Sequence, residues 1–259
     1  MAFKHQAILC ERDNIAHILI NTSIKKALVI DPTDPKKVEH ALKAYEADLV
    51  AILNTHSHFD HTSGNTYLSN AFGIPVYGPE KEAKDIPEIR YHLKDGQVLN
   101  IAGISIRALE TKGHTRGALS FEIEGKALVT GDTLFLLGCG NTNFGGNVDV
   151  LYETFANIYM KLDDNLIVLP GHDYSEKNLA FLQSVIPDLQ NISVVREKIH
   201  KEHFQNNIPF SLLGEEKIYN PFLLVFNENI LKDIVSHLKL KDQNPKEAFS
   251  KLRQLRNVF

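Results

Sequence analysis

An apolar segment that leads directly into a histidine-rich turn constrains this chain more than any other feature. Leu49 to Leu53 are all apolar, and the run Thr55-His56-Ser57-His58-Phe59-Asp60-His61 follows almost at once. A short apolar run of this kind predicts a buried strand. In an α/β sheet, ligands bind at the carboxyl ends of such strands. The sequence therefore predicts an α/β fold with a polar cluster at the end of an interior strand.

Strand patterns dominate the first two thirds of the chain. The strands that we expect cover residues 17–20, 27–30, 49–53, 75–77, 97–101, 104–109, 118–123, 127–130 and 166–169. Val38 to Tyr45 has apolar residues at helical spacing, which predicts a strand–helix–strand unit with a right-handed crossover. Glu124-Gly125 and the segment from Asn100 to Gly103 are typical of hairpin turns.

The pattern changes near residue 174, where strand signals give way to helical ones. We expect amphipathic helices over residues 177–185, 193–204, 228–238 and 245–258, with 206–220 as one long connection. The chain therefore divides into a strand-rich catalytic domain over residues 1–173 and a helical domain over 174–259. A helical addition of this kind typically modifies substrate access or binding.

The histidine-rich run has the composition of a metal site. Three imidazoles and one carboxylate within six residues cannot easily bind a single ion, because neighbouring side chains diverge. Pairing His56 with His58, and Asp60 with His61, would instead supply ligands to two adjacent ions. Further ligands are expected at other strand ends, where three polar residues each follow a glycine: His114, Asp132 and His172.

Composition excludes several other classes of protein. The net charge is −4, without a dense Lys/Arg block, which argues against a nucleic-acid partner. The two cysteines, Cys10 and Cys139, exclude a disulfide framework and favour a reducing compartment. No segment has the apolar core of a signal peptide or the roughly 20 apolar residues of a membrane span. We expect a cytoplasmic protein without a membrane partner.

These ligands, in this order, resemble the pattern of the metallo-β-lactamase superfamily. Within it the chain is similar to glyoxalase II, the hydroxyacylglutathione hydrolase family, and the likeness includes Gly138-Cys139-Gly140, Gly171-His172-Asp173-Tyr174 and Asn220-Pro221-Phe222. The resemblance implies an αββα sandwich with a helical C-terminal domain. It also implies the ligand sets: His56, His58 and His114 on one ion, Asp60, His61 and His172 on the other, and Asp132 bridging both.

The resemblance further implies a reaction, a cofactor and a substrate site. The family hydrolyses S-2-hydroxyacylglutathione, such as S-lactoylglutathione, to glutathione and a 2-hydroxy acid such as D-lactate, in methylglyoxal detoxification. Two divalent metal ions, zinc with iron or manganese as alternatives, would activate water, with Asp60 and Asp132 as the catalytic carboxylates. Tyr174, Arg253 and Arg256 match the family's glutathione-binding positions. The chain departs from the family at Asn141 and Leu224, where basic residues are usual.

Two alternatives remain open at this point. A persulfide dioxygenase of the same fold would use a single iron on His56, His114 and Asp132. A non-catalytic thiol- or metal-binding module would be expected to have a broken ligand set, whereas all seven ligand positions are intact here.

Overall fold

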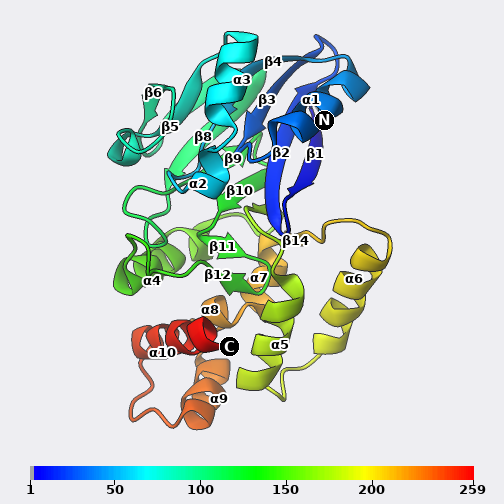
Figure 1. Ribbon diagram of the computed structural model, residues 1–259. Helices are drawn as coiled ribbons and strands as arrows, with labels where there is room; N and C mark the ends of the chain where they lie inside the picture. Colours follow the sequence, from blue (N-terminus) through cyan, green and yellow to red (C-terminus); the bar gives the residue numbers. More distant parts are fainter. Residues whose placement is uncertain (1–2) are drawn as a thin grey trace. The chain divides into compact units, whose positions relative to one another are not determined.

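The computed structural model describes residues 3–259, which group into two compact units (Figure 1). The first unit comprises residues up to 111 together with 116–131 and 169–172. The second comprises residues 112–115, 132–168 and 173–259. The domain boundary expected at residue 173 stays a prediction.

The first unit contains a six-stranded sheet in the order β1-β2-β3-β4-β5-β6. Strands β1 to β3 are antiparallel, and β3 to β6 are parallel. The strands span Lys4–Cys10 (β1), Asn14–Asn21 (β2), Lys26–Ile30 (β3), Asp48–Leu53 (β4), Val76–Pro79 (β5) and Ile89–Leu93 (β6). The connections contain the helices Pro35–Tyr45 (α1), Phe59–Thr62 (α2) and Asn65–Phe72 (α3), and a 3-10 turn over Glu80–Glu82 (η1).

Local chemistry explains why α1 forms and where it packs. The Asp34 side chain accepts backbone N–H groups of the first turn, and Glu46 ends the helix in the left-handed conformation at φ 49°. The apolar residues Val38 and Leu42 are buried in one cluster with residues of β2, β3 and β4. The predicted strand–helix–strand unit is therefore confirmed, and β4 delivers the histidine-rich turn from the interior of the sheet.

A second sheet has the order β14-β13-β10-β9-β8-β7. Its strands span Val98–Ile101 (β7), Ile104–Glu110 (β8), Leu119–Ile123 (β9), Ala127–Gly131 (β10), Ile167–Pro170 (β13) and Ser211–Leu212 (β14). Both predicted hairpins are present, between β7 and β8 and between β9 and β10. Their turns place consecutive residues in the left-handed region, Ala102 and Gly103 at φ 55° and 74°, and Glu124 and Gly125 at φ 54° and 63°. This is the conformation of tight hairpin turns.

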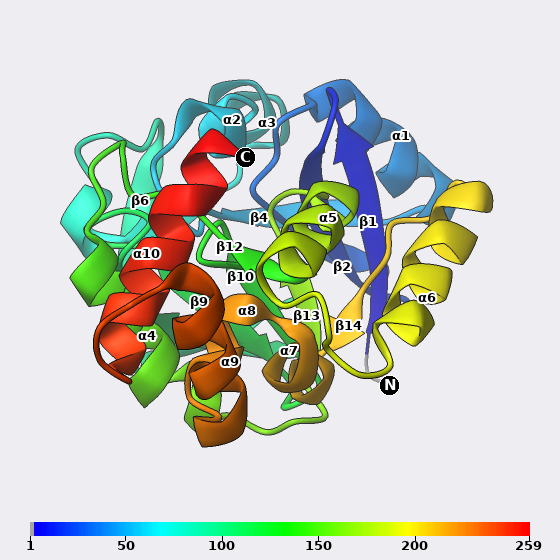
Figure 2. The ribbon, with the colours of Figure 1, turned by 90° about the horizontal axis from the view of Figure 1, so that it is seen from below.

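The second unit is mainly helical (Figure 2). Aromatic side chains form part of its core. Its elements are Leu134–Phe135 (β11), Gly138–Cys139 (β12), Val148–Asn157 (α4), a 3-10 turn over Tyr159–Lys161 (η2), Ser175–Val185 (α5), Ile192–Phe204 (α6), Leu213–Tyr219 (α7), Pro221–Leu224 (α8), Glu228–Leu238 (α9) and Pro245–Val258 (α10). Phe249 of α10 packs edge-on against Phe155 of α4 and Phe222 of α8, at centroid distances of 5.2 Å in both pairs. In residues 3–259, no helix combines the length and apolarity that a bilayer span requires.

The expected helices of the C-terminal region are confirmed, but the expected connection over 206–220 is wrong. It contains β14 and α7, two short elements whose apolar residues are too few to produce a periodic pattern. Helices α3 and α4 and strands β1 and β6 were not predicted either. Strand β1 is half-buried at most positions, so its two faces differ little, and β6 is exposed at three of its five positions.

A buried carboxylate supports the β11–β12 hairpin of the second unit. Glu216 of α7 is 1% exposed and accepts hydrogen bonds from Leu137 N, Asn220 Nδ2 and Ser211 Oγ, at 2.8, 2.9 and 2.6 Å. Asn220 Nδ2 also donates to the carbonyls of Phe135 and Gly138. Burial raises the pKa of Glu216 to about 7, against the lowering effect of these hydrogen bonds. The hairpin is therefore held by an ionisable group in an apolar environment.

We predict that the free energy of unfolding depends on pH through Glu216. The pKa of Glu216 is raised in the folded state, so its stabilising contribution is complete below its ordinary pKa near 4.5 and is lost as the pH rises towards 7. Glu216→Gln should therefore gain stability relative to the native protein across this range, by about 1.4 kcal/mol per pH unit at most. Urea unfolding of both proteins from pH 4.5 to 8 measures the difference. A difference independent of pH would contradict the prediction.

Candidate metal centre

The histidine-rich turn of the first unit is fixed by hydrogen bonds to its backbone. Asn54 Nδ2 donates to the carbonyl of His61 at 3.0 Å, and Asn65 Nδ2 donates to Asn54 Oδ1 at 2.7 Å. The buried carboxylate of Glu82 accepts the N–H groups of Ser57 and Gly117, at 2.8 and 2.7 Å. The turn is therefore a rigid platform that presents its imidazoles from a defined backbone.

Asp31 lies directly after β3 and organises the histidines of the turn. Its Oδ1 accepts a hydrogen bond from Thr55 N at 2.8 Å, and its Oδ2 accepts one from Thr55 Oγ1 at 2.6 Å. The same Oδ2 lies 3.0 Å from His61 Nδ1. A carboxylate can only accept, so His61 carries a proton on Nδ1 and a neutral ring has its lone pair on Nε2.

The hydroxyl of Thr55 fixes the protonated nitrogen of His56 in the same way. Thr55 Oγ1 lies 2.9 Å from His56 Nδ1, and the hydroxyl proton is already directed at Asp31. The oxygen therefore accepts from His56 Nδ1–H, which again leaves the lone pair on Nε2. The close grouping of Asp31, His56 and His61 is explained in this way, because Asp31 orients the two rings from behind.

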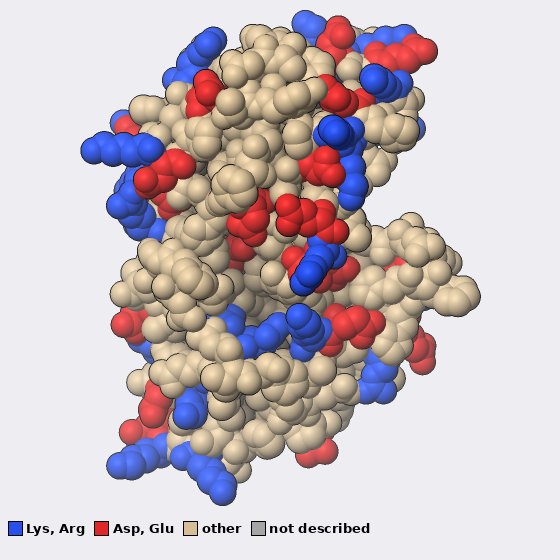
Figure 3. Space-filling model, viewed as in Figure 1, with Lys and Arg blue, Asp and Glu red and all other residues tan. Residues whose placement is uncertain are grey.

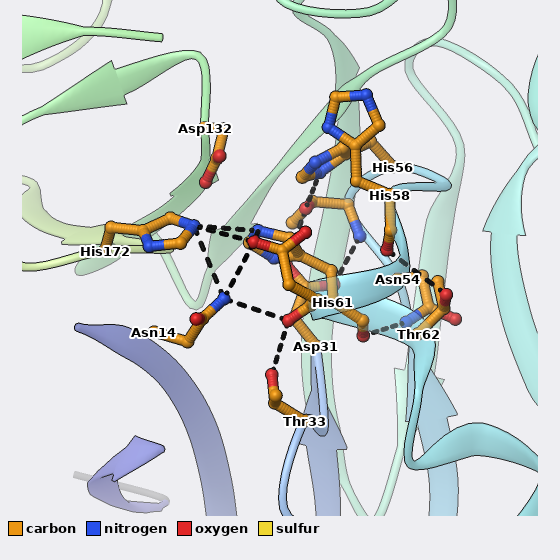
Figure 4. A network of polar contacts seen from close by, with 12 residues as sticks. Asn14, Asp31, Thr33, Asn54, His56, His58, His61, Thr62, Asp132 and His172 are labelled. Carbon is orange, nitrogen blue, oxygen red and sulfur yellow. Dashed lines mark hydrogen bonds and ion pairs between the residues drawn. The ribbon is translucent and has the colours of Figure 1, made fainter. Parts of the chain in front are cut away.

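His172 follows the same rule with a different carboxylate. Its Nδ1 lies 2.9 Å from Asp13 Oδ1, and its Nε2 points towards the opposite side, where it meets His61 (Figure 4). The two Nε2 atoms are 3.3 Å apart, and His172 Nε2 is also 3.3 Å from Asp60 Oδ2. Asn14 Nδ2 donates to Asp60 Oδ2 at 3.1 Å and so positions this carboxylate.

This arrangement fits a metal ion. Two neutral imidazoles protonated on Nδ1 turn their Nε2 lone pairs towards each other and towards a carboxylate oxygen, which is a repulsive arrangement unless a metal ion or a proton lies among them. His61 and His172 are 1% and 4% exposed, so little water screens the repulsion. Imidazoles whose second nitrogen donates to a carboxylate are the usual protein ligands of zinc. Asp60, His61 and His172 thus have the chemistry of one ion's ligand set.

The second unit holds two of the predicted ligands, His114 and Asp132. His114 Nδ1 lies 2.7 Å from the carbonyl oxygen of Asn141, so this nitrogen is the donor, and Nε2 lies 3.6 Å from Asp132 Oδ2. Gly140 permits this packing, because a Cβ there would lie 1.9 Å from the Asp132 carbonyl and 2.7 Å from His114 Nδ1. His114 therefore presents the same nitrogen as the histidines of the first unit.

The three predicted substrate-binding residues line one cavity of the second unit, with a volume of 340 Å³. Tyr174 packs edge-on against Phe135, with centroids 5.3 Å apart. Arg253 is 5% exposed and donates through Nη1 to the carbonyls of Cys139 and Gly140. Arg256 Nε donates to Asn178 Oδ1 at 3.0 Å. The structure brings these three side chains together, with Arg253 also holding the backbone after β12.

Sequence reasoning missed the residues that orient the ligands. Asp31, Asp13 and Glu82 have no place in the ligand pattern that the sequence predicts. A signal for Asp31 was present, since it directly follows an apolar strand, as His114, Asp132 and His172 nearly do. Asp13 and Glu82 lie in loops with no such pattern, and only the tertiary structure identifies them.

We predict that Asp31→Asn weakens metal binding by roughly 10–100-fold while secondary structure is retained. The carboxylate of Asp31 accepts three hydrogen bonds. The amide of an asparagine would direct its NH2 group at one of those three donors, so that hydrogen bond would be lost. Asp13→Asn, at a half-buried position, should act in the same way on His172. Zinc affinity measured by competition with a chelator, with exposed Asp48→Asn as the control, tests both variants. Native affinity in both would refute the orienting role.

Comparisons with known proteins identify the family of this chain. A family model for the metallo-beta-lactamase superfamily matches residues 17–172, and one for the hydroxyacylglutathione hydrolase C-terminus matches residues 173–259. The hydroxyacylglutathione hydrolase of Vibrio campbellii is 34% identical over 93% of this chain and 94% of its own length. That of Dictyostelium discoideum is 31% identical over 99% and 100%.

Solved structures show the same fold at lower identity. The B3 metallo-beta-lactamase BLEG-1 has a TM-score of 0.67 at 24% identity, over 85% of this chain and 99% of its own. ETHE1 from Myxococcus xanthus has a TM-score of 0.67 at 21% identity, over 100% and 99%. The predicted fold class and the predicted resemblance are confirmed. Both parts of the chain match and the relatives are matched along nearly their whole length, so the chain belongs to the hydroxyacylglutathione hydrolase (glyoxalase II) family of the metallo-β-lactamase superfamily.

Proposed function

We propose that this protein hydrolyses glutathione thioesters, with S-lactoylglutathione as substrate and glutathione and D-lactate as products. The observation that carries the proposal is the pair of facing Nε2 atoms of His61 and His172 beside Asp60. Carboxylates behind the two rings hold this arrangement. Family membership supplies the reaction for which such a centre is used.

We assign two divalent ions, preferably zinc, to the seven predicted ligands. His56, His58 and His114 would bind one ion, Asp60, His61 and His172 the other, and Asp132 both. Imidazole and carboxylate ligands suit zinc as well as iron and manganese. When bound, such ions lower the pKa of water towards neutrality and polarise a carbonyl group.

The chain's own residues contribute orientation and charge. Asp31 holds the Nδ1 proton of His61 and Asp13 that of His172, so that each neutral ring presents the lone pair of Nε2. Asp60 and Asp132 supply negative charge, which balances part of the charge of two cations. The leaving group is a thiolate with an ordinary pKa near 8.5, so it departs without a strong general acid. This agrees with a site built from ligands and their orienting partners.

We assign the glutathione carrier to the 340 Å³ cavity of the second unit. Tyr174, Arg253 and Arg256 are the proposed contacts there, as the family pattern implies. The Nη1 donor of Arg253 is already used by backbone carbonyls, so Arg253 contributes mainly its charge and the shape of the wall. Arg256 is the arginine better placed to bind a carboxylate directly.

We also propose a reducing, cytoplasmic location. Both cysteines are buried and are not joined in a disulfide. Burial raises the pKa of Cys139 to about 11, although the nearby Arg253 lowers it, so its thiol is poorly reactive. A cytosol that contains glutathione would supply both the reducing condition and the carrier.

We predict two metal ions per chain and thioester hydrolysis by the same sample. Asp132→Ala should retain the fold but lose roughly a hundredfold or more in turnover, since even the loss of an orienting partner costs 10–100-fold. Elemental analysis, together with thiol release from S-lactoylglutathione, measures both quantities. A single iron per chain with oxygen uptake on a persulfide would instead establish the dioxygenase alternative.

Arg256→Ala should raise KM for S-lactoylglutathione roughly tenfold, the usual effect of losing one charge-assisted contact. The contact is remote from the attacked carbonyl and acts equally in the ground and transition states, so kcat should change little. Steady-state kinetics are compared with those of Arg90→Ala, which removes an exposed arginine of the first unit. Equal KM values in the two variants would remove Arg256 from the carrier site.

A further inference from the structure

The cavity of the second unit has more positive charge than its neighbours can balance. Lys177, Arg253 and Arg256 line it, and in the described part of the chain Asp132 is the one acidic residue of its wall. On the face seen in Figure 3, basic and acidic side chains lie in both halves, and several basic side chains form a row across the lower half. Like charges that share a wall repel one another, and an anionic ligand would relieve that repulsion.

The two arginines are partly committed to the protein itself. Arg253 donates to two backbone carbonyls and to Asn257 Oδ1, and its guanidinium stacks on Phe222 at 5.5 Å. Its buried Nε has no hydrogen-bond partner among residues 3–259. Arg256 is held by Asn178, and burial followed by repulsion from Arg253 lowers its pKa. The wall thus retains uncompensated positive charge and a buried donor.

Lys177 adds a third positive charge at a helix N-terminus, where a positive charge is unfavourable. It lies in the first turn of α5, next to the positive end of the helix dipole, where basic residues are unfavourable. It is exposed, and its Nζ lies 6.0 Å from the centroid of the Tyr174 ring. The acidic residue beside it, Glu176, is paired instead with His200 and His203 of α6. Residues placed against local preference are typical of functional sites.

We propose that Lys177 is a substrate-binding residue that, together with Arg256, recognises the two carboxylates of the glutathione carrier. Glutathione has one carboxylate at each end of its peptide, and each would meet one of the two cations. Arg253 then acts as a positioning residue that keeps the wall in place. This inference rests on the proposed function, because it assumes that the carrier occupies the cavity.

The test compares Lys177→Ala with the rescue variant Lys177→Arg and with Lys232→Ala, an exposed lysine of α9 outside the cavity. KM for S-lactoylglutathione should rise roughly tenfold in Lys177→Ala, recover in Lys177→Arg and stay native in Lys232→Ala. With the diethyl ester of the same substrate, which lacks both carboxylates, all four proteins should have similar KM values. Thermal stability of the unliganded Lys177→Ala protein should equal or exceed that of the native protein. An unchanged KM in Lys177→Ala, or an equal rise with the diester, would overturn the inference.

A binding measurement separates this inference from the proposed reaction. S-Methylglutathione is a thioether and cannot be hydrolysed, so its affinity by calorimetry does not depend on catalysis. Lys177→Ala should weaken its binding roughly tenfold even if the native protein hydrolysed no thioester, an outcome that would refute the proposed function alone. Native affinity for S-methylglutathione in Lys177→Ala, in a protein that does hydrolyse the thioester, would refute the role of Lys177 alone.

Discussion

The buried carboxylate of Asp31 is the interaction on which the metal centre of the first unit depends. A charge that is 2% exposed is costly unless several donors satisfy it. Its donors are the backbone and hydroxyl of Thr55 and the ring of His61. Satisfying Asp31 therefore fixes the start of the histidine-rich turn, the ring of His61 and, through the Thr55 hydroxyl, the ring of His56. The hydrogen bonds that stabilise one buried charge therefore also orient two of the proposed metal ligands.

The two units place opposite kinds of charge in their sites. The first unit gathers carboxylates and imidazoles, whose lone pairs suit cations. The second lines a cavity with Arg253, Arg256 and Lys177, which suit an anion. Both arrangements are electrostatically unfavourable without a ligand, and rigid hydrogen-bonded backbone holds each in place. A folded protein tolerates such a cost where binding or catalysis uses it.

The sequence alone was sufficient to predict strand β4, the histidine-rich turn after it and the hairpins at Glu124-Gly125 and Ala102-Gly103. Each depends on local chemistry: an apolar run, an unusual density of imidazoles, or residues that tolerate left-handed backbone. The orienting carboxylates could not be predicted, because Asp13 and His172 meet only in the folded chain. The hydrogen bonds from Arg253 to backbone carbonyls could not be predicted either, since α10 and β12 lie far apart in sequence. Residue type predicted the ligands, whereas tertiary contacts determined which nitrogen each ligand presents.

The protonation state of the imidazoles tests the account most directly. In ¹⁵N NMR spectra of the metal-free protein, at a pH at which the rings are neutral, His56, His61 and His172 should each carry the proton on Nδ1 and none on Nε2. Titration with zinc should then shift the Nε2 resonances and leave the Nδ1 protons in place. Rings that carry the proton on Nε2, or zinc that displaces the Nδ1 protons, would contradict the claim that buried carboxylates prepare these histidines for metal.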